Sequence, residues 1–314
     1  MSWNTVLLGL IAIYLTLVHA LRYRRRDSII HRFSPAGRQS LSTLSLADAH
    51  SIVLDLATLE FPCTFSGSIF FALFKLSSSS TASKHAADTG FMITETVLNA
   101  PSSPRVIDGV ARMDYLSGRY RKAGKITDDD MLYTLGLFAL EPVRWNAVYD
   151  WRVLTDVEEC AHGVFWRDMG EAMEISYEQL RPYMGVSEGE GSDAGDGLAW
   201  MDALQMWCDG YEIRHMLPAV SNKRVAKATL DIAVFNVTTR LRGVAVGLVS
   251  ALLEPRLRRA MTFEDPPIIY AQLLTAVLNL RKWLYTTSVF PDRCGSVQSG
   301  SPTKKTSPPA GTML

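Results

Sequence analysis

The N-terminal segment limits the folds open to this chain more than any other feature. Residues 3–21 are almost wholly apolar, and about 20 such residues in a helix are enough to cross the hydrocarbon core of a bilayer. Four arginines follow between positions 22 and 26, whereas no lysine or arginine precedes the apolar run. A cleaved signal peptide has the reverse arrangement, with its positive charge first. The positive-inside rule therefore predicts one transmembrane helix with a cytosolic domain behind it.

A signal peptide followed by a lumenal domain is the alternative topology. Asn236, Val237 and Thr238 form an acceptor sequence for N-glycosylation, which only a lumenal domain could use. The two topologies therefore differ in whether glycosidase changes the electrophoretic mobility of the protein.

The rest of the chain has the pattern of a helical protein. Apolar residues recur at helical spacing, and strand-like alternation never persists beyond a few residues. The pattern predicts an all-α fold with a single helical domain over residues 44–293, behind a membrane anchor at residues 1–26 and a polar linker at residues 27–43. Residues 294–314 are rich in Ser, Pro and Thr and are expected to be a disordered tail. The expected helices span residues 46–59, 65–76, 82–98, 128–141, 198–216, 225–240, 244–253 and 267–284.

Two helix starts have local signals. Thr127 precedes three aspartates, which the helix dipole favours in a first turn, and this explains them better than a metal site does. Thr155 and Glu158 have the spacing of a capping box. We expect Pro142 to end the helix that starts after Thr127, because proline has no N–H donor.

Composition excludes several functions. The formal net charge is zero, which argues against nucleic acid as a partner because nucleic-acid-binding domains carry a basic surface. The four cysteines form no CxxC pair and are expected to be free thiols in a reducing compartment. Nucleotide-binding, serine-hydrolase and zinc-protease motifs are absent from the sequence.

Aromatic and cationic residues are densely interleaved between Arg112 and Glu178. This region and its flanks contain Leu59-Glu-Phe-Pro62, Arg119-Tyr-Arg-Lys-Ala-Gly124, Glu141-Pro-Val-Arg-Trp145, Tyr149-Asp-Trp-Arg152 and Tyr211-Glu-x-x-His-Met-x-Pro218. In combination these pieces resemble the fungal ER-bound oxygenases typified by MpaB, a family related to the bacterial rubber oxygenases. The resemblance covers roughly residues 45–290.

The resemblance implies a fold, a location and a reaction. It implies a globin-like helical core, held at the endoplasmic reticulum membrane by one N-terminal span, with the main domain in the cytosol. Relatives of known activity cleave olefinic carbon chains with dioxygen, and a b-type haem does this in the rubber oxygenases. The expected function is therefore a haem b-dependent oxygenase of secondary metabolism that cleaves or oxygenates the prenyl or isoprenoid side chain of a hydrophobic small molecule.

Three residues are predicted to hold the haem. His215 is the expected axial ligand, while Arg119 and Arg152 are expected to bind the propionates or a polar head group of the substrate. Glu212 and His215 form a Glu-x-x-His pair, but a di-iron site needs two such pairs. The other histidines of the helical region, at positions 50, 85 and 162, are interpreted as surface residues.

Two departures from the family pattern leave other functions open. The family's core motif has a histidine where this chain has Ser117, and hydroxyl is a poorer iron ligand than imidazole. Roughly one to two helical turns that the family has after the position of Lys75 are missing here. Either change could remove cofactor binding. A cofactor-free lipid-binding or scaffold relative is therefore one alternative, and a cofactor-free enzyme such as a cyclase or isomerase is another.

Overall fold

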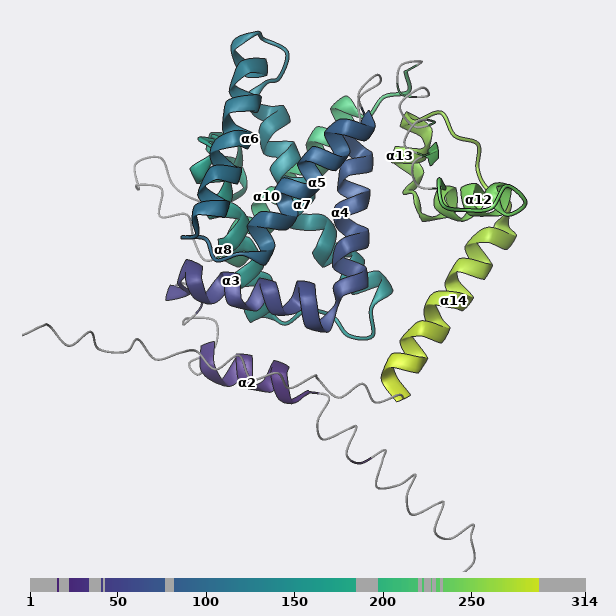
Figure 1. The fold of residues 1–314 in the computed structure, drawn as a ribbon, viewed down its shortest axis with the longest axis horizontal. Coiled ribbons are helices and arrows are strands. Elements are labelled where there is room, and N and C mark those ends of the chain that lie inside the picture. Colours follow the sequence, from purple (N-terminus) through teal and green to yellow (C-terminus); the bar gives the residue numbers. More distant parts are fainter. Residues whose placement is uncertain are drawn as a thin grey trace, which may run out of the picture.

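The computed structural model describes residues 23–33, 41, 43–76, 82–184, 197–219 and 234–287, with isolated residues at positions 16, 222, 227, 230 and 231. Throughout these residues the secondary structure is helical and no strand occurs, which confirms the all-α prediction (Figure 1). In chain order the elements are α2 (Arg24–Phe33), α3 (Leu46–Asp55), the π-helical turn η2 (Leu56–Glu60), α4 (Pro62–Leu76), α5 (Ala82–Leu98), α6 (Pro104–Lys122), α7 (Asp128–Tyr149), α8 (Asp156–Ala172), the 3-10 turn η3 (Glu178–Leu180), α9 (Arg181–Met184), α10 (Gly197–His215), α12 (Arg242–Leu252), α13 (Pro255–Ala260) and α14 (Ile268–Thr287).

Helix α7 is the centre of the fold. It packs against α4, α8 and α10, while α3 covers α8 and α5 pairs with α6. Leu132, Leu137 and Ala139 of α7 are at most 2 % exposed, and they share one apolar core with the fully buried indoles of Trp166 and Trp200. The outer helices therefore depend on a central helix that is buried on several sides.

The predicted capping boxes are confirmed at α7 and α8. Thr127 Oγ1 accepts a hydrogen bond from the N–H of Asp130, and the Asp130 carboxylate accepts one from the N–H of Thr127. Thr155 and Glu158 make the same reciprocal pair at the start of α8. Each box satisfies N–H groups that have no partner within the helix, so both helices begin at a fixed residue.

The prediction that Pro142 ends α7 is wrong, because the helix continues through it. A proline inside a helix removes one N–H, which leaves the carbonyl four residues earlier, that of Phe138, without its helical donor. His162 of α8 replaces that donor, since its buried ring hydrogen-bonds the backbone of Phe138 and Ala139. Trp166 Nε1 donates to His162 Nε2 at 3.1 Å, so the other ring nitrogen carries the hydrogen that faces α7.

The interpretation of the histidines as surface residues is also wrong for two of them. His162 is only 1 % exposed, because it supplies the donor that Pro142 removes. His50 of α3 is 6 % exposed, and its Nε2 lies 3.0 Å from the carbonyl oxygen of Val97. The side chain of His85 lies outside the described residues.

Two glycines allow α8 and α10 to touch. A Cβ atom at Gly163 would lie 2.3 Å from the carbonyl oxygen of Gly197, and one at Gly197 would lie 2.3 Å from that of Cys160. No larger residue fits at either position without moving a backbone, so the two helices cross where both lack a side chain.

Two further boundaries differ from the sequence expectation. Residues 27–33, expected in a polar linker, belong to α2. The Ile29 side chain of this helix is buried in an apolar cluster with Leu41 and Ala49. Residues 234–241, expected to lie largely in a helix, form turns, and the N–H of Val237 donates to the carbonyl of Val234. Local polar composition misled the first assignment, and apolar spacing misled the second.

The described helices were compared with the length and apolar composition that a bilayer crossing requires. Among the described residues no single helix is both long and apolar enough to cross a bilayer. The segments Leu46–Glu60 and Pro62–Ile69 have the length and composition for it only together, and they are bent by 106°. The expected anchor at residues 3–21 lies outside the described residues except for Thr16, as does the expected tail at 294–314. The single-pass topology, the domain boundaries and the globin-like core stay predictions.

Helices α12 to α14 stand beside the main body in Figure 1. Helix α14 packs against α12. One link to the body is a small apolar cluster, in which Phe71 of α4 meets Leu253, Leu257 and Met261. This second cluster brings α13 next to the end of α4, where the polar site described below lies.

The burial of His162 makes the stability of the fold depend on pH. Burial lowers the pKa of His162 from 6.5 to about 4, although the two carbonyls of α7 act in the opposite direction. Between these values the unfolded chain binds a proton that the folded chain does not. We therefore expect the free energy of unfolding to fall as the pH is lowered from 6.5 to 4, by about 3 kcal/mol from this residue.

Urea denaturation at a series of pH values measures this dependence. His162→Gln is the comparison, because glutamine keeps a donor and an acceptor but does not titrate. The two stability curves should converge below pH 6.5, as the wild-type protein loses the stability that the variant cannot lose. Parallel curves across this range would contradict the assignment.

Candidate active site

The side chain of Lys75 is fully buried where α4, α7 and α10 meet. Its Nζ lies 2.8 Å from Glu141 Oε1 on α7 and 3.3 Å from Glu212 Oε1 on α10. The exposed fraction is 0 % for the lysine side chain and at most 4 % for either glutamate. Buried charges are tolerated only when they are paired, so the two carboxylates are the reason that a lysine can occupy this position.

Lys75 keeps its proton in this environment. Burial is the largest single influence on its pKa and lowers it, but the charges of Glu141, Glu212 and Glu254 together outweigh burial and raise the pKa. Tyr133 donates to the same Glu212 oxygen at 3.1 Å, and burial together with that carboxylate raises the pKa of the phenol. The junction therefore holds a permanent ammonium group and a permanently protonated phenol.

Two arginines surround the junction on its outer side. Arg144 lies 3.1 Å from Glu141 and 3.3 Å from Asp209, and Arg256 of α13 lies 3.6 Å from Glu212. These side chains line an open cavity of about 530 Å³. The carboxylates at the centre therefore interact with cations on both sides.

Tyr211 of α10 is the centre of an aromatic stack. Its ring centroid lies 4.6 Å from that of Tyr133, 5.3 Å from Trp207 and 4.3 Å from His215. Its hydroxyl donates to Asp130 Oδ1 at 2.5 Å. Burial and this carboxylate raise the pKa of Tyr211, so the phenol remains a donor at neutral pH.

A cavity of about 280 Å³, which we call the His215 pocket, opens beside these groups. Its polar lining consists of Lys75, Asp130, Tyr133, Thr134, Tyr211, His215 and Asn222. Its apolar lining consists of Met216, Leu257, Ala260 and Met261, mostly from α13 and its C-terminal end. Such a two-sided lining suits a molecule with an oxygen-bearing end and a hydrocarbon chain.

The three predicted haem-binding residues lie in separate places. His215 is exposed at the C-terminal end of α10 and lines the His215 pocket. Arg119 is exposed on α6 and lines a different cavity of about 760 Å³. Arg152 lines neither cavity. The structure does not bring the three together around one space, and their roles stay predictions.

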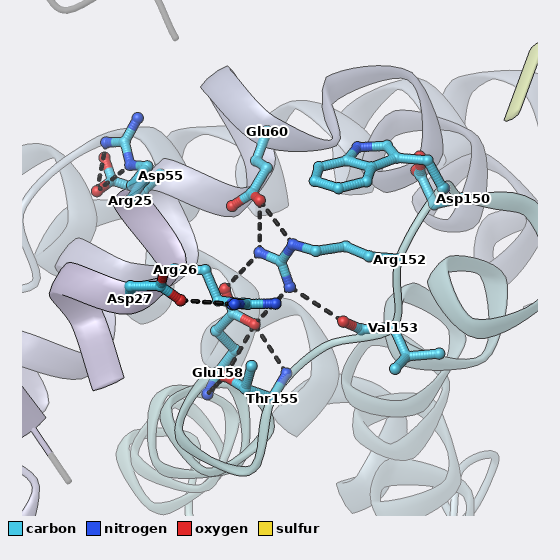
Figure 2. Close-up of polar contacts among 11 residues, drawn as sticks. Arg25, Arg26, Asp27, Asp55, Glu60, Asp150, Arg152, Val153, Thr155 and Glu158 are labelled. Atoms are coloured by element: carbon cyan, nitrogen blue, oxygen red, sulfur yellow. Dashed lines mark hydrogen bonds and ion pairs between the residues drawn. The ribbon is translucent and has the colours of Figure 1, made fainter. Parts of the chain in front are cut away.

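Arg152 is enclosed between two carboxylates (Figure 2). Its Nη2 lies 2.5 Å from Glu60 Oε1 and 2.7 Å from Glu158 Oε1, and its Nη1 lies 2.8 Å from Glu158 Oε2. All three side chains are at most 7 % exposed. Because Glu158 also caps α8 through Thr155, this ion-pair cluster joins η2 to the start of α8.

The described lining of the His215 pocket does not fit a b-type haem. A haem ligand needs an apolar slot wide enough for the porphyrin. Most of the residues that line it are polar, among them Asp130, Thr134 and Asn222, and the Tyr211 ring covers one face of His215. His162 offers no alternative ligand, because both of its ring nitrogens are hydrogen-bonded in the core.

A polynuclear metal site is equally without support in the part of the chain that is described. No group of three or more His, Cys, Asp or Glu side chains there could hold a metal ion. The Glu212–His215 pair diverges, since the carboxylate is buried against Lys75 while the imidazole is exposed. No reaction step is therefore assigned to an iron centre here.

Sequence reasoning missed Lys75 and Tyr133 as site residues. Lys75 ends a strongly apolar run that begins at Phe65, and Glu141 lies in another that begins at Leu135. A charge inside an apolar helical run has to find a partner of opposite sign. Lys75 and Glu141 are two such charges of opposite sign in two expected helices, and this signal would have predicted that they pair.

The comparisons relate this protein to ER-bound oxygenases. It is 33% identical over 299 residues to the ER-bound oxygenase mpaB' of Penicillium brevicompactum, which covers 90% of this chain and 69% of the relative. It is 33% identical over 280 residues to the ER-bound oxygenase mpaB of Penicillium roqueforti, which covers 84% of this chain and 92% of the relative. No protein-family model matches the sequence. The chain belongs to the MpaB-like family of ER-bound oxygenases.

Replacing Arg152 by methionine should lower the free energy of unfolding by about 3–5 kcal/mol. The substitution removes the cation from between two buried carboxylates, and such uncompensated charges are strongly destabilising. Urea denaturation measures the loss. Arg105→Met is the matched control, because it breaks a pair with Glu95 in which the arginine is 67 % exposed, and it should cost at most about 1 kcal/mol. Equal losses in the two variants would show that the Arg152 cluster is not structural.

The absorption spectrum of detergent-purified full-length protein, expressed with a haem precursor, tests His215 as an axial ligand. We expect the Soret region to be the same in the wild type and in His215→Ala, because the described lining does not fit a porphyrin. A wild-type Soret band that the substitution shifts or abolishes would contradict this and identify His215 as the iron ligand.

Proposed function

We propose that this protein is an oxygenase of the endoplasmic reticulum membrane that cleaves or oxygenates a prenyl or isoprenoid side chain with dioxygen, and that the substrate binds in the His215 pocket. Membership of the MpaB-like family supports the oxygenase role. The observation that carries the assignment to this pocket is its two-sided lining, in which Tyr211 and His215 lie with Leu257, Ala260 and Met261 around one space.

The two sides of the pocket bind different parts of the substrate. Leu257, Ala260 and Met261 form the apolar side, where each buried methylene group contributes about 0.8 kcal/mol. The oxygen-bearing end lies against Tyr211 and His215 on the polar side, whose rings are already stacked on each other before binding. A prenylated aromatic compound has both parts.

The polar side also offers hydrogen bonds to the oxygen-bearing end. Its lining includes Tyr211, Asn222 and His215, and His215 is exposed to solvent. An imidazole can both donate and accept a proton. The polar side therefore orients the oxygen-bearing end, while His215 passes protons between that end and solvent.

A cofactor-free lipid-binding or scaffold protein is the second candidate. It is favoured by Ser117, which stands where the family has a histidine, and by the poor fit of a haem to the His215 pocket. This candidate uses the same pocket to bind the hydrocarbon chain without oxidising it.

Incorporation of labelled oxygen separates the two functions. Full-length protein in detergent is supplied with ¹⁸O₂ and a farnesyl-substituted phenol, and products are followed by mass spectrometry. We expect labelled product from the wild type and a roughly 10²-fold slower rate from His215→Ala, the size of loss usual for a proton-transfer residue. His31→Ala is the matched control, since His31 is exposed on α2, and it should leave the rate unchanged.

Each other outcome has a clear meaning. A wild type that binds the phenol but incorporates no label favours the lipid-binding candidate. Equal incorporation of label by the wild type and by His215→Ala would contradict the assignment of the reaction to this pocket, while leaving the oxygenase role intact.

A further inference from the structure

The outward face of α14 has an uninterrupted apolar stripe. Ile269, Leu273, Val277 and Leu280 follow one another at spacings of four, four and three residues, so they line one face of the helix. Their exposed fractions are 61 %, 44 %, 54 % and 55 %. Contiguous exposed apolar side chains of this kind mark a surface that contacts something other than water.

An adjacent face attaches α14 to the rest of the protein. The ring of Tyr270 lies against Gly247 of α12, where a Cβ atom would approach it to 2.7 Å. Arg281 donates to the carbonyl of Tyr149 at the end of α7 at 3.1 Å, and Lys282 donates to the neighbouring carbonyl at 2.5 Å. The basic residues of α14 therefore face the body, and the stripe faces away from it.

A third arc of the helix carries the polar, uncharged residues Gln272, Thr275 and Asn279, and the helix contains no acidic residue. Its two basic residues, Arg281 and Lys282, bind backbone carbonyls of α7. No carboxylate of the helix therefore opposes transfer of the stripe into an apolar phase.

The expected anchor indicates which apolar phase is near. Residues 3–21 lead directly into α2, so α2 stands at the lipid surface if that run spans the bilayer. In Figure 1 both α2 and the C-terminal end of α14 lie at the lower edge of the molecule. Trp283 near that end is of a residue type enriched at membrane interfaces.

We propose that the apolar stripe of α14 docks into the lipid surface of the endoplasmic reticulum membrane, beside the N-terminal anchor. The binding comes from burial of the stripe in the interface between headgroups and acyl chains. The inference rests on the membrane association in the proposed function, but not on the reaction or on the identity of the substrate.

Docking of α14 has a consequence for the His215 pocket. Helix α13, which supplies much of the apolar wall of that pocket, is joined to α14 by residues 261–267 alone. A membrane-bound α14 therefore holds this wall close to the lipid in which a prenyl chain dissolves. The hydrocarbon chain can then enter the pocket with little passage through water.

Collision accessibility of single spin labels tests the docking. Leu273→Cys and Val277→Cys place a label in the stripe, and Thr275→Cys and Asn279→Cys are matched controls on the polar arc of the same helix. Exposed Cys63 and the C-terminal Cys294 are replaced by serine, while the buried Cys160 and Cys208 are kept. The full-length protein is reconstituted in vesicles of phosphatidylcholine and phosphatidylinositol. Each label is exposed to oxygen, which concentrates in lipid, and to a nickel chelate, which stays in water.

We expect the ratio of oxygen to nickel accessibility to reverse between the two pairs, with oxygen favoured at 273 and 277 and nickel favoured at 275 and 279. Nickel-accessible labels at 273 and 277 would overturn the proposal. Labels there that are shielded from both reagents would also overturn it, because they would mean that protein covers the stripe, either a second copy or residues 3–21. The measurement involves no turnover, so its result is independent of whether the protein is an oxygenase.

Discussion

The arrangement of the body depends on a single buried charge. Lys75 lies near the end of α4, and Glu141 and Glu212 approach it from α7 and α10. Loss of one member of such a cluster typically costs about 3–5 kcal/mol, a large part of the roughly 5–15 kcal/mol by which a domain is stable. The three helices can therefore pack only in the register that brings these groups together. The same requirement places the candidate active site at their junction.

Two other buried polar groups set the register of α8. Arg152 joins the capping carboxylate of Glu158 to Glu60 in η2, and His162 replaces the donor that Pro142 takes from α7. Apolar burial supplies most of the favourable free energy, but it is non-directional. Hydrogen bonds and ion pairs that must be made in one geometry therefore decide which of the many apolar packings is adopted.

Local signals were enough to predict the helices but not the site. Thr127 and Thr155 cap their helices through residues three positions away, so the sequence contains the whole interaction. Pro142 was misjudged because the group that compensates for it, His162, is on another helix. Lys75 was overlooked for the same reason, since its partners lie 66 and 137 residues away. Arg152 was read as free to bind a ligand, and only the fold shows that two carboxylates already enclose it.

The two departures from the family pattern fall in different parts of the structure and differ in consequence. Ser117 lies on α6, and it is not among the residues that line the His215 pocket. The shortened segment begins at Leu76, directly after Lys75, which is itself a lining residue of that pocket. A difference at position 117 therefore lies away from the His215 pocket, whereas a difference in length after Lys75 lies at its edge. Because the Lys75 ammonium group ties α4 to α7 and α10, the length of the connection that follows it bears on how the three helices pack around the pocket.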